Sequence, residues 1–193
     1  LVHALYKAAL FMVAGIIDHA TGTRDTAILG GLAARMPTTL IAACLAGLSM
    51  AGLPPLLGFM GKELIYEAAL LSNMSLIVMV VAIGANACMV AIAAVIALRC
   101  FVGRPQAELQ ETVQAATEPS IRMWMGPLIL AALGLVFGLL PGLIQPFLVQ
   151  AAAAVQGESL PYTLSLWHGI TPMLALSAVT LVAGAVLFFN WDL

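Results

Sequence analysis

The sequence predicts an all-α membrane protein, a polytopic bundle of about five transmembrane helices in which one helix is broken. Hydrophobic residues make up 63% of the 193 residues and charged residues only 8%, whereas charged residues make up about 25% of a soluble domain. The apolar residues also form runs of about 20 residues, the length that crosses a bilayer. We therefore expect one multi-pass membrane domain over 1–193, and a partial one, because Leu1 already lies inside an apolar run.

Five apolar runs are long enough to be membrane spans, and they cover 1–17, 36–71, 75–101, 124–140 and 170–190. A further apolar stretch, 143–156, is too short to cross the bilayer comfortably, so we expect an interfacial or re-entrant helix there. His168 precedes the last span beside Trp167, a residue type common at membrane interfaces, and we expect this histidine to be structural.

The second span is expected to be a broken helix. As one helix, 36–71 would be about 54 Å long, far beyond a hydrocarbon core of about 30 Å. Pro54 and Pro55 remove two backbone donors near its middle, and Gly52 and Gly58 loosen the chain on either side. Broken helices at membrane depth need protein or a water-filled cavity around their freed backbone groups, and they are common at ion pathways.

The arginines predict the orientation of the chain. All five lie in or beside two connections, 18–35 and 102–122, whereas the connections 72–74 and 141–169 contain no lysine or arginine. Five crossings place both arginine-bearing loops on one side, which the positive-inside rule makes cytoplasmic. A hairpin at the prolines would move loop 102–122 outside, so a single crossing by the broken helix is favoured. The C-terminal residues 190–193 are then expected on the cytoplasmic side as well.

Lys7 and His3 are polar residues inside the first expected span. Lys7 lies about ten residues, or roughly 15 Å, from the expected cytoplasmic end of its helix, which is near the membrane midplane. His3 is one turn deeper on the same face, and Tyr6 lies beside them with a hydroxyl that makes it a candidate relay partner. A lysine in hydrocarbon is costly, and lysine and histidine both exchange protons when their surroundings tune them, so we predict a proton path. The alternative is that Lys7 snorkels or pairs with an acid while His3 only fills space.

Lys62 follows the helix break and should lie in the outer half of the membrane or near its outer surface. In one interpretation it belongs to an interfacial turn in which Lys62, Glu63 and Glu67 touch water. In the other it lines a cavity, with Glu63 as a candidate ion-pair or relay partner, and the preceding run GLPPLLGF favours this second interpretation. Asn86, in the third span, is expected to hydrogen-bond between helices.

Motifs of soluble enzymes are absent from the sequence. It contains no phosphate-binding glycine loop, no nucleophile elbow and no HExxH motif. We therefore predict that the chain is not an enzyme acting through its own residues, and we expect no metal site and no cofactor. No basic cluster indicates a nucleic-acid partner.

The run HALYKAALFMVAG resembles the antiporter-like subunit family shared by respiratory complex I, membrane-bound hydrogenases and Mrp-type cation/proton antiporters. Members of that family carry a histidine and a lysine at this spacing on a transmembrane helix. Further along they have a broken helix with a glycine-phenylalanine and a lysine-acid signature. Here the matching run is GLPPLLGFMGKE, and Lys62 follows Lys7 by 55 residues, a separation typical of the family.

Three longer runs narrow the resemblance to the large A-type component of Mrp monovalent cation/proton antiporters. They are IIDHATGTRDTAILGGL, LSMAGLPPLLGF and LSLWHGITPMLALSAVTLVAGAVL. The family usually has an isoleucine and a basic residue after the arginine-aspartate pair, where this chain has Thr26 and Ala27. The departure lies in a loop and leaves the resemblance standing.

The resemblance implies a role for each polar residue. Lys7 would be the central proton-carrying lysine, His3 its relay partner, and Lys62 the terminal lysine near the outer exit. The implied protein is a component of a Na+ or K+/proton antiporter, a secondary transporter of the bacterial cell (inner) membrane with other membrane subunits as partners. The alternatives are a proton-pumping component of complex I (NADH-quinone oxidoreductase) or of a membrane-bound hydrogenase, and a scaffold in which buried charges pair only for packing.

Overall fold

The computed structural model describes residues 1–193 except 158–162, 168, 170 and 191–193. Within the described residues all regular secondary structure is helical, which confirms the predicted all-α class. The longer helices are α1 (Val2–Thr21), α2 (Pro37–Ala51), α3 (Leu57–Leu71), α4 (Ser75–Ala94), α7 (Ile121–Leu139), α8 (Gln145–Gln156) and α9 (Pro172–Phe189). His168 and residues 191–193 of the expected cytoplasmic end lie outside the described residues.

Short helical segments join these helices: η1 (Leu32–Ala34), the π-helical turn η2 (Val95–Arg99), α5 (Cys100–Val102), η3 (Ala107–Leu109), α6 (Gln110–Ala115) and η4 (Pro141–Leu143). Because η2 and α5 continue α4, the chain forms one apolar helix over 75–102. Among the described residues, this helix, α7 and α9 are the three that are long and apolar enough to cross a membrane. The helices α2 and α3 have 15 residues each, so each is only about 22 Å long.

The helices α1, α2 and α7 pack closely against one another in the interior of the bundle. Small residues from each meet in one buried cluster, among them Ala9, Ala46 and Ala131. Small side chains let membrane helices approach closely and gain packing energy without a large apolar core. This packing fixes how α1 is rotated, and therefore which of its polar residues face inward.

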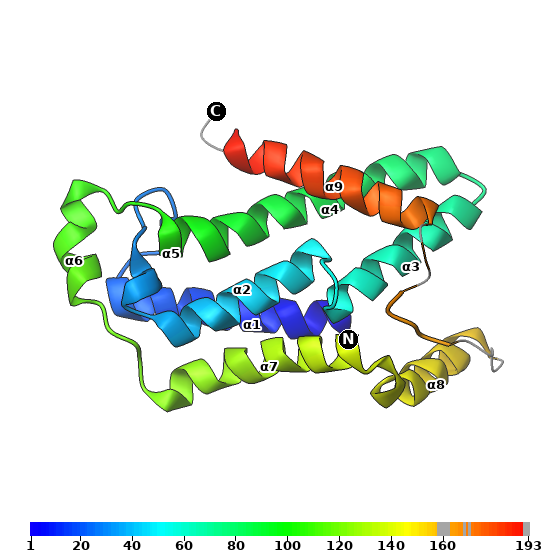
Figure 1. Ribbon diagram of the computed structural model, residues 1–193, viewed down its shortest axis with the longest axis horizontal. Coiled ribbons are helices and arrows are strands. Elements are labelled where there is room, and N and C mark those ends of the chain that lie inside the picture. Colours follow the sequence, from blue (N-terminus) through cyan, green and yellow to red (C-terminus); the bar gives the residue numbers. More distant parts are fainter. Residues whose placement is uncertain (158–162, 168, 170, 191–193) are drawn as a thin grey trace.

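The predicted break in the second span lies between α2 and α3. The helix α2 ends at Ala51 and is capped by Gly52 with φ 71° and ψ 48°, a left-handed conformation that glycine adopts without strain. The peptide bond between Pro54 and Pro55 is cis. Figure 1 shows that α3 continues toward the end of the molecule to which α2 points, so the chain does not fold back as a hairpin.

Backbone packs directly against backbone around the break. A Cβ atom on Gly58 would lie 1.7 Å from the carbonyl oxygen of Ser49, and one on Gly138 would lie 2.0 Å from the carbonyl oxygen of Pro55. Gly58 therefore lets the start of α3 cross α2, and Gly138 lets α7 cover the non-helical segment. Protein therefore packs closely against part of the break, whereas Pro54 at its tip is exposed.

The two arginine-bearing connections lie together at one end of the bundle. In Figure 1 they are at the left, whereas the α3–α4 connection and α8 are at the right. The two connections pack against each other, and the backbone N–H of Gln106 donates to the carbonyl oxygen of Ile28 (3.1 Å). Glu118 caps α2 from this end, because its carboxylate accepts the backbone N–H groups of Thr38 (2.8 Å) and Thr39 (3.2 Å). We call this the arginine end and the opposite end the arginine-free end.

Candidate functional site

Lys62 occupies the helix break. It lies near the start of α3, its side chain is 4% exposed, and its Nζ atom donates a hydrogen bond to the carbonyl oxygen of Ala51 (3.0 Å). Ala51 is the last residue of α2. The last carbonyl groups of a helix have no partner inside the helix and carry partial negative charge. The break therefore provides the acceptor and the favourable potential that a buried ammonium group needs.

Gly52 is part of the same arrangement. A Cβ atom at this position would lie 2.6 Å from Cε and 2.8 Å from Nζ of Lys62. The stem of the lysine thus lies directly against the backbone of the cap. Glycine is required here for two independent reasons, the positive φ and the space that the lysine fills.

A cavity of about 450 Å³ opens beside Lys62 between α1, α2, α3 and α4. This volume is sufficient for several water molecules. Most of its lining is apolar, and its polar lining residues are His3, Tyr6, Ser49, Lys62 and Asn86. His3 is exposed, so the cavity opens to the surface of the chain, and it brings residues that are far apart in the sequence to one place.

His3 and Tyr6 face this cavity from α1. Their rings meet edge to face, with centroids 5.3 Å apart. The Tyr6 hydroxyl is oriented toward α4, where it donates to Sδ of Met89 (3.9 Å). Asn86, also on α4, donates to the carbonyl oxygen of Ala82 in its own helix (2.8 Å), and among the described residues it does not form the expected hydrogen bond between helices. The amide finds its acceptor one turn back along α4 instead of on a neighbouring helix.

Lys7 lies outside this cavity. It is partly exposed, on a face of α1 that includes Phe11, whose side chain is 73% exposed. Among the residues that the structure describes, none accepts a hydrogen bond from Lys7 or forms an ion pair with it. The structure therefore brings His3 and Tyr6 to Lys62, and it does not bring Lys7 to Lys62. The roles of these four residues stay predictions.

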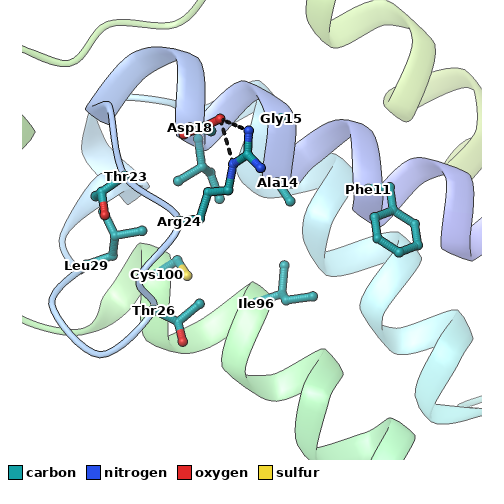
Figure 2. A pocket seen from close by; sticks show the side chains of 11 residues that line it. Phe11, Ala14, Gly15, Asp18, Thr23, Arg24, Thr26, Leu29, Ile96 and Cys100 are labelled. Carbon is teal, nitrogen blue, oxygen red and sulfur yellow. Dashed lines mark hydrogen bonds and ion pairs between the residues drawn. The ribbon is translucent and has the colours of Figure 1, made fainter.

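A second pocket, of about 340 Å³, lies at the arginine end of α1 (Figure 2). Phe11 and Asp18 line it from α1, with Arg24 from the following loop and Cys100 from α5. The Arg24 guanidinium pairs with the Asp18 carboxylate (2.8 Å), and this hydrogen bond and the carboxylate charge raise the pKa of Arg24. Arg24 is 85% exposed, so the pair contributes little to stability. This ion pair lies at the arginine end of the bundle.

Both acidic residues after the break are partly exposed. Glu63 directly follows Lys62 in α3, and its role as an ion-pair or relay partner stays a prediction. Glu67 lies one turn further along α3.

Sequence reasoning missed two cavity-lining residues, Ser49 and Met89. Neither carries a local signal, because their position depends on how α2 and α4 pack against α1.

The chain is similar to known antiporter subunits. A family model described as "NADH:quinone oxidoreductase/Mrp antiporter, TM" matches residues 1–89. The A1 component of a Na(+)/H(+) antiporter of Staphylococcus haemolyticus is 35% identical, over 98% of this chain and 25% of that protein. The A component of a Na(+)/H(+) antiporter of Alkalihalophilus pseudofirmus is 33% identical, over 98% of this chain and 26% of that protein. The A/B component of a probable K(+)/H(+) antiporter of Rhizobium meliloti is 40% identical, over 97% of this chain and 19% of that protein.

A solved structure is also similar. The Mrp complex from Dietzia sp. contains a chain that superposes with a TM-score of 0.80 at 36% identity, over 98% of this chain and 20% of that one. The relatives are named as antiporter subunits, which are transporters rather than enzymes. The present chain spans about a quarter of the length of the curated Na(+)/H(+) antiporter subunits that it matches.

Proposed function

We propose that this chain, as a member of the antiporter-like family of Mrp A-type components, provides part of the proton path of a monovalent cation (Na+ or K+)/proton antiporter. One observation carries the proposal. Lys62 is buried at the end of a broken membrane helix, beside a cavity that His3 and Tyr6 also line. A titratable residue inside a membrane bundle that faces a cavity is typical of ion and proton pathways.

The surroundings of Lys62 suit a residue that alternately holds and releases a proton. Burial disfavours the charged ammonium, whereas the terminal carbonyl group of α2 favours it. Because these two contributions oppose each other, a small change in the local field is sufficient to move the proton. His3 lines the same cavity and would exchange protons with its water, and Tyr6 would hold the His3 ring in place.

Coupling to the cation would be electrostatic. Charges in a membrane interior are poorly screened, so a cation that arrives elsewhere in the complex shifts the protonation of buried groups along a path. In this proposal Lys7 is the central station of that path, as its resemblance to the family implies. The relatives include both Na(+)/H(+) and K(+)/H(+) antiporter subunits by name, so the proposal covers either cation.

We further propose the setting in which this path works. The chain would lie in a bacterial inner membrane with the arginine end, which holds loops 18–35 and 102–122, in the cytoplasm. Lys62 would then release protons toward the outer side. Other membrane subunits of a hetero-oligomeric antiporter would be its partners.

Two alternatives are distinguishable by experiment. A proton-pumping component of complex I or a hydrogenase would use the same lysines but would depend on a redox partner. Genes for iron–sulfur or quinone-site subunits beside its own would favour that alternative, and genes for small antiporter subunits would favour our proposal. A scaffold would tolerate loss of the Lys62 charge, because replacing a buried charge by an apolar side chain is often neutral or stabilising.

The deciding experiment measures cation-driven proton movement in everted membrane vesicles that contain the full-length complex. Lys62→Met keeps an unbranched side chain only one atom shorter than lysine and removes the charge. We expect assembly at the normal level and a rate at least about tenfold lower, because a positioned proton carrier contributes about 10²-fold or more. Leu71→Met, on the same helix but exposed and outside the cavity lining, serves as the matched control. A Lys62→Met complex that transports at the normal rate would refute the proposed function.

A further inference from the structure

A second buried polar group lies between α3 and α9, outside the cavity described above. Tyr66 and Thr180 are both fully buried, and their hydroxyl groups are hydrogen-bonded to each other. Thr180 Oγ1 also donates to the carbonyl oxygen of Leu176 (2.8 Å). A threonine hydroxyl has one proton to donate, so in this arrangement Tyr66 is the donor and Thr180 the acceptor of their shared bond. The two hydroxyls thus form a directed chain.

Ser177 extends this chain by one turn of α9. Its side chain is 3% exposed, and none of the described residues forms a hydrogen bond with its Oγ atom. A buried hydroxyl without a partner is unfavourable, and native proteins usually satisfy such a group with ordered water or give it a function. It lies three residues before Thr180, and residues at that spacing share a helix face.

The surroundings of these hydroxyls are otherwise apolar. Tyr66 packs in a cluster whose other members are Ala69, Met79, Ala82, Ile83, Met173 and Leu176. Two hydroxyl groups on two helices therefore meet in an interface in which hydrocarbon would pack as well, and the buried Ser177 hydroxyl lies one turn away along α9. Burial alone does not explain why polar rather than apolar residues occupy these positions.

The hydroxyls also lie in order along the bundle. Tyr66 is one turn beyond Lys62 on the same face of α3, about 6 Å nearer the arginine-free end. Its side chain leans back over the turn that holds Lys62, because Cβ atoms in a helix tilt toward the N-terminus. The helix α9 begins at the arginine-free end, so Ser177 lies nearer that end than Thr180 does (Figure 1).

We propose that Tyr66, Thr180 and Ser177 form a hydroxyl relay that carries protons from Lys62 toward the arginine-free end. The proposal rests on the function proposed above and names residues that it did not include. The Lys62 ammonium gives a proton to a bridging water and becomes a neutral amine. The water passes a proton to the Tyr66 oxygen as Tyr66 passes its own to Thr180, and Thr180 passes its own by a second water to Ser177. Each hydroxyl ends with one proton, and one proton leaves at the far end.

The relay makes a prediction that a structural role does not. Ser177→Ala removes a buried hydroxyl that has no partner among the described residues, so a purely structural account expects equal or greater stability and unchanged transport. The relay expects equal or greater stability together with slower transport. Tyr66→Phe keeps the packing of the ring and leaves the Thr180 bond to Leu176 intact, so it should also slow transport without preventing assembly.

The test uses the full-length complex in everted vesicles and measures the rate of cation-driven proton movement in H2O and in D2O. We expect Ser177→Ala, Tyr66→Phe and Thr180→Val to lower the rate about tenfold, less than the 10²–10⁴-fold effect of a positioned proton donor, because water partly replaces a hydroxyl. Their solvent isotope effects should also differ from that of the unmodified complex. Thr180→Ser, which keeps the hydroxyl, should restore the rate.

Thr21→Val is the matched control. Thr21 donates to the carbonyl oxygen four residues before it, as Thr180 does, but it lies at the arginine end of α1 (2.7 Å to Ile17). Unmodified rates and isotope effects in both Ser177→Ala and Tyr66→Phe would overturn the relay. Lys62→Met, measured alongside, separates this result from failure of the proposed function. If Lys62→Met is inactive while the hydroxyl variants transport normally, only the relay is rejected and the proposed function stands.

Discussion

The two lysines of the chain lie in different surroundings. Lys62 is buried at the end of α2 and donates to the carbonyl oxygen of Ala51, whereas Lys7 lies in the middle of α1 and is partly exposed. In an unbroken helix the backbone carbonyl groups are already bonded within the helix, so Lys7 has no backbone acceptor among the residues that the structure describes. A helix break leaves such acceptors free. The difference shows how a membrane protein can hold a buried lysine ammonium with the carbonyl groups of its own backbone.

The largest expected effect comes from closing the space on which the break depends. Gly58→Ala would place a Cβ atom 1.7 Å from the Ser49 carbonyl oxygen, and no side-chain rotation relieves a contact with backbone. Overpacking a core typically costs about 1–3 kcal/mol, and this clash should exceed that range. We expect little assembled complex in membranes, measured by size-exclusion chromatography of the solubilised protein.

Gly84→Ala provides the control for this change. Gly84 lies within α4, and a Cβ atom there would meet nothing within 4 Å. Alanine is favoured over glycine inside helices by about 1 kcal/mol, so this variant should assemble normally or better. Equal assembly of Gly58→Ala and Gly84→Ala would contradict the close crossing of α2 and α3.

Gly52→Ala should have the next largest effect, and it acts on Lys62 directly. A residue other than glycine at φ 71° costs about 1–3 kcal/mol, and the new Cβ atom would collide with the Lys62 side chain. We expect a lower melting temperature and transport reduced as strongly as in Lys62→Met. A Gly52→Ala complex with normal transport would show that Lys62 does not need its place against the cap.

Lys7→Met should change transport but not stability. No described residue bonds to Lys7, so its removal breaks no contact within the described part of the chain. If Lys7 is a station of the proton path, cation-driven proton movement should stop while the melting temperature of the complex stays the same. Near-normal antiport in this variant would remove Lys7 from the path and leave Lys62 as its only supported lysine.

The smallest effect is expected for Tyr6→Phe. The change removes a weak hydrogen bond to Met89 Sδ and keeps the ring contact with His3. We expect a loss of about 0.5 kcal/mol or less in stability, below that of an average hydrogen bond, and a modest decrease in the rate of proton movement. A large decrease would mean that the hydroxyl itself carries protons, which would make Tyr6 a relay residue rather than a support for His3.

Some of these features were predictable from the sequence for a physical reason. Composition alone indicates membrane helices, and two prolines flanked by glycines indicate a break, because both signals are local. The grouping of His3 and Tyr6 with Lys62 was not predictable, since it depends on how α1 is rotated against α2. Sequence reasoning paired His3 with Lys7 because those residues share a face of α1.

Two further features of the structure could not be predicted from the sequence. The hydrogen bond between Tyr66 and Thr180 joins residues 114 positions apart, which no spacing rule anticipates. The π-helical turn Val95–Arg99 lies in a stretch, 85–102, that contains no proline or glycine to mark it. Both features appear only when the helices are placed together.

The central claim, that a positive charge at the end of α2 carries the proton, is tested most directly by chemical rescue. In a full-length complex whose Cys44, Cys88 and Cys100 are replaced by alanine, Lys62→Cys should be inactive. Attaching an aminoethyl group to the new thiol should restore cation-driven proton movement, whereas a neutral propyl group of similar length should not. Equal activity with the aminoethyl and the propyl group would contradict the account. Failure of both groups to restore activity would contradict it as well.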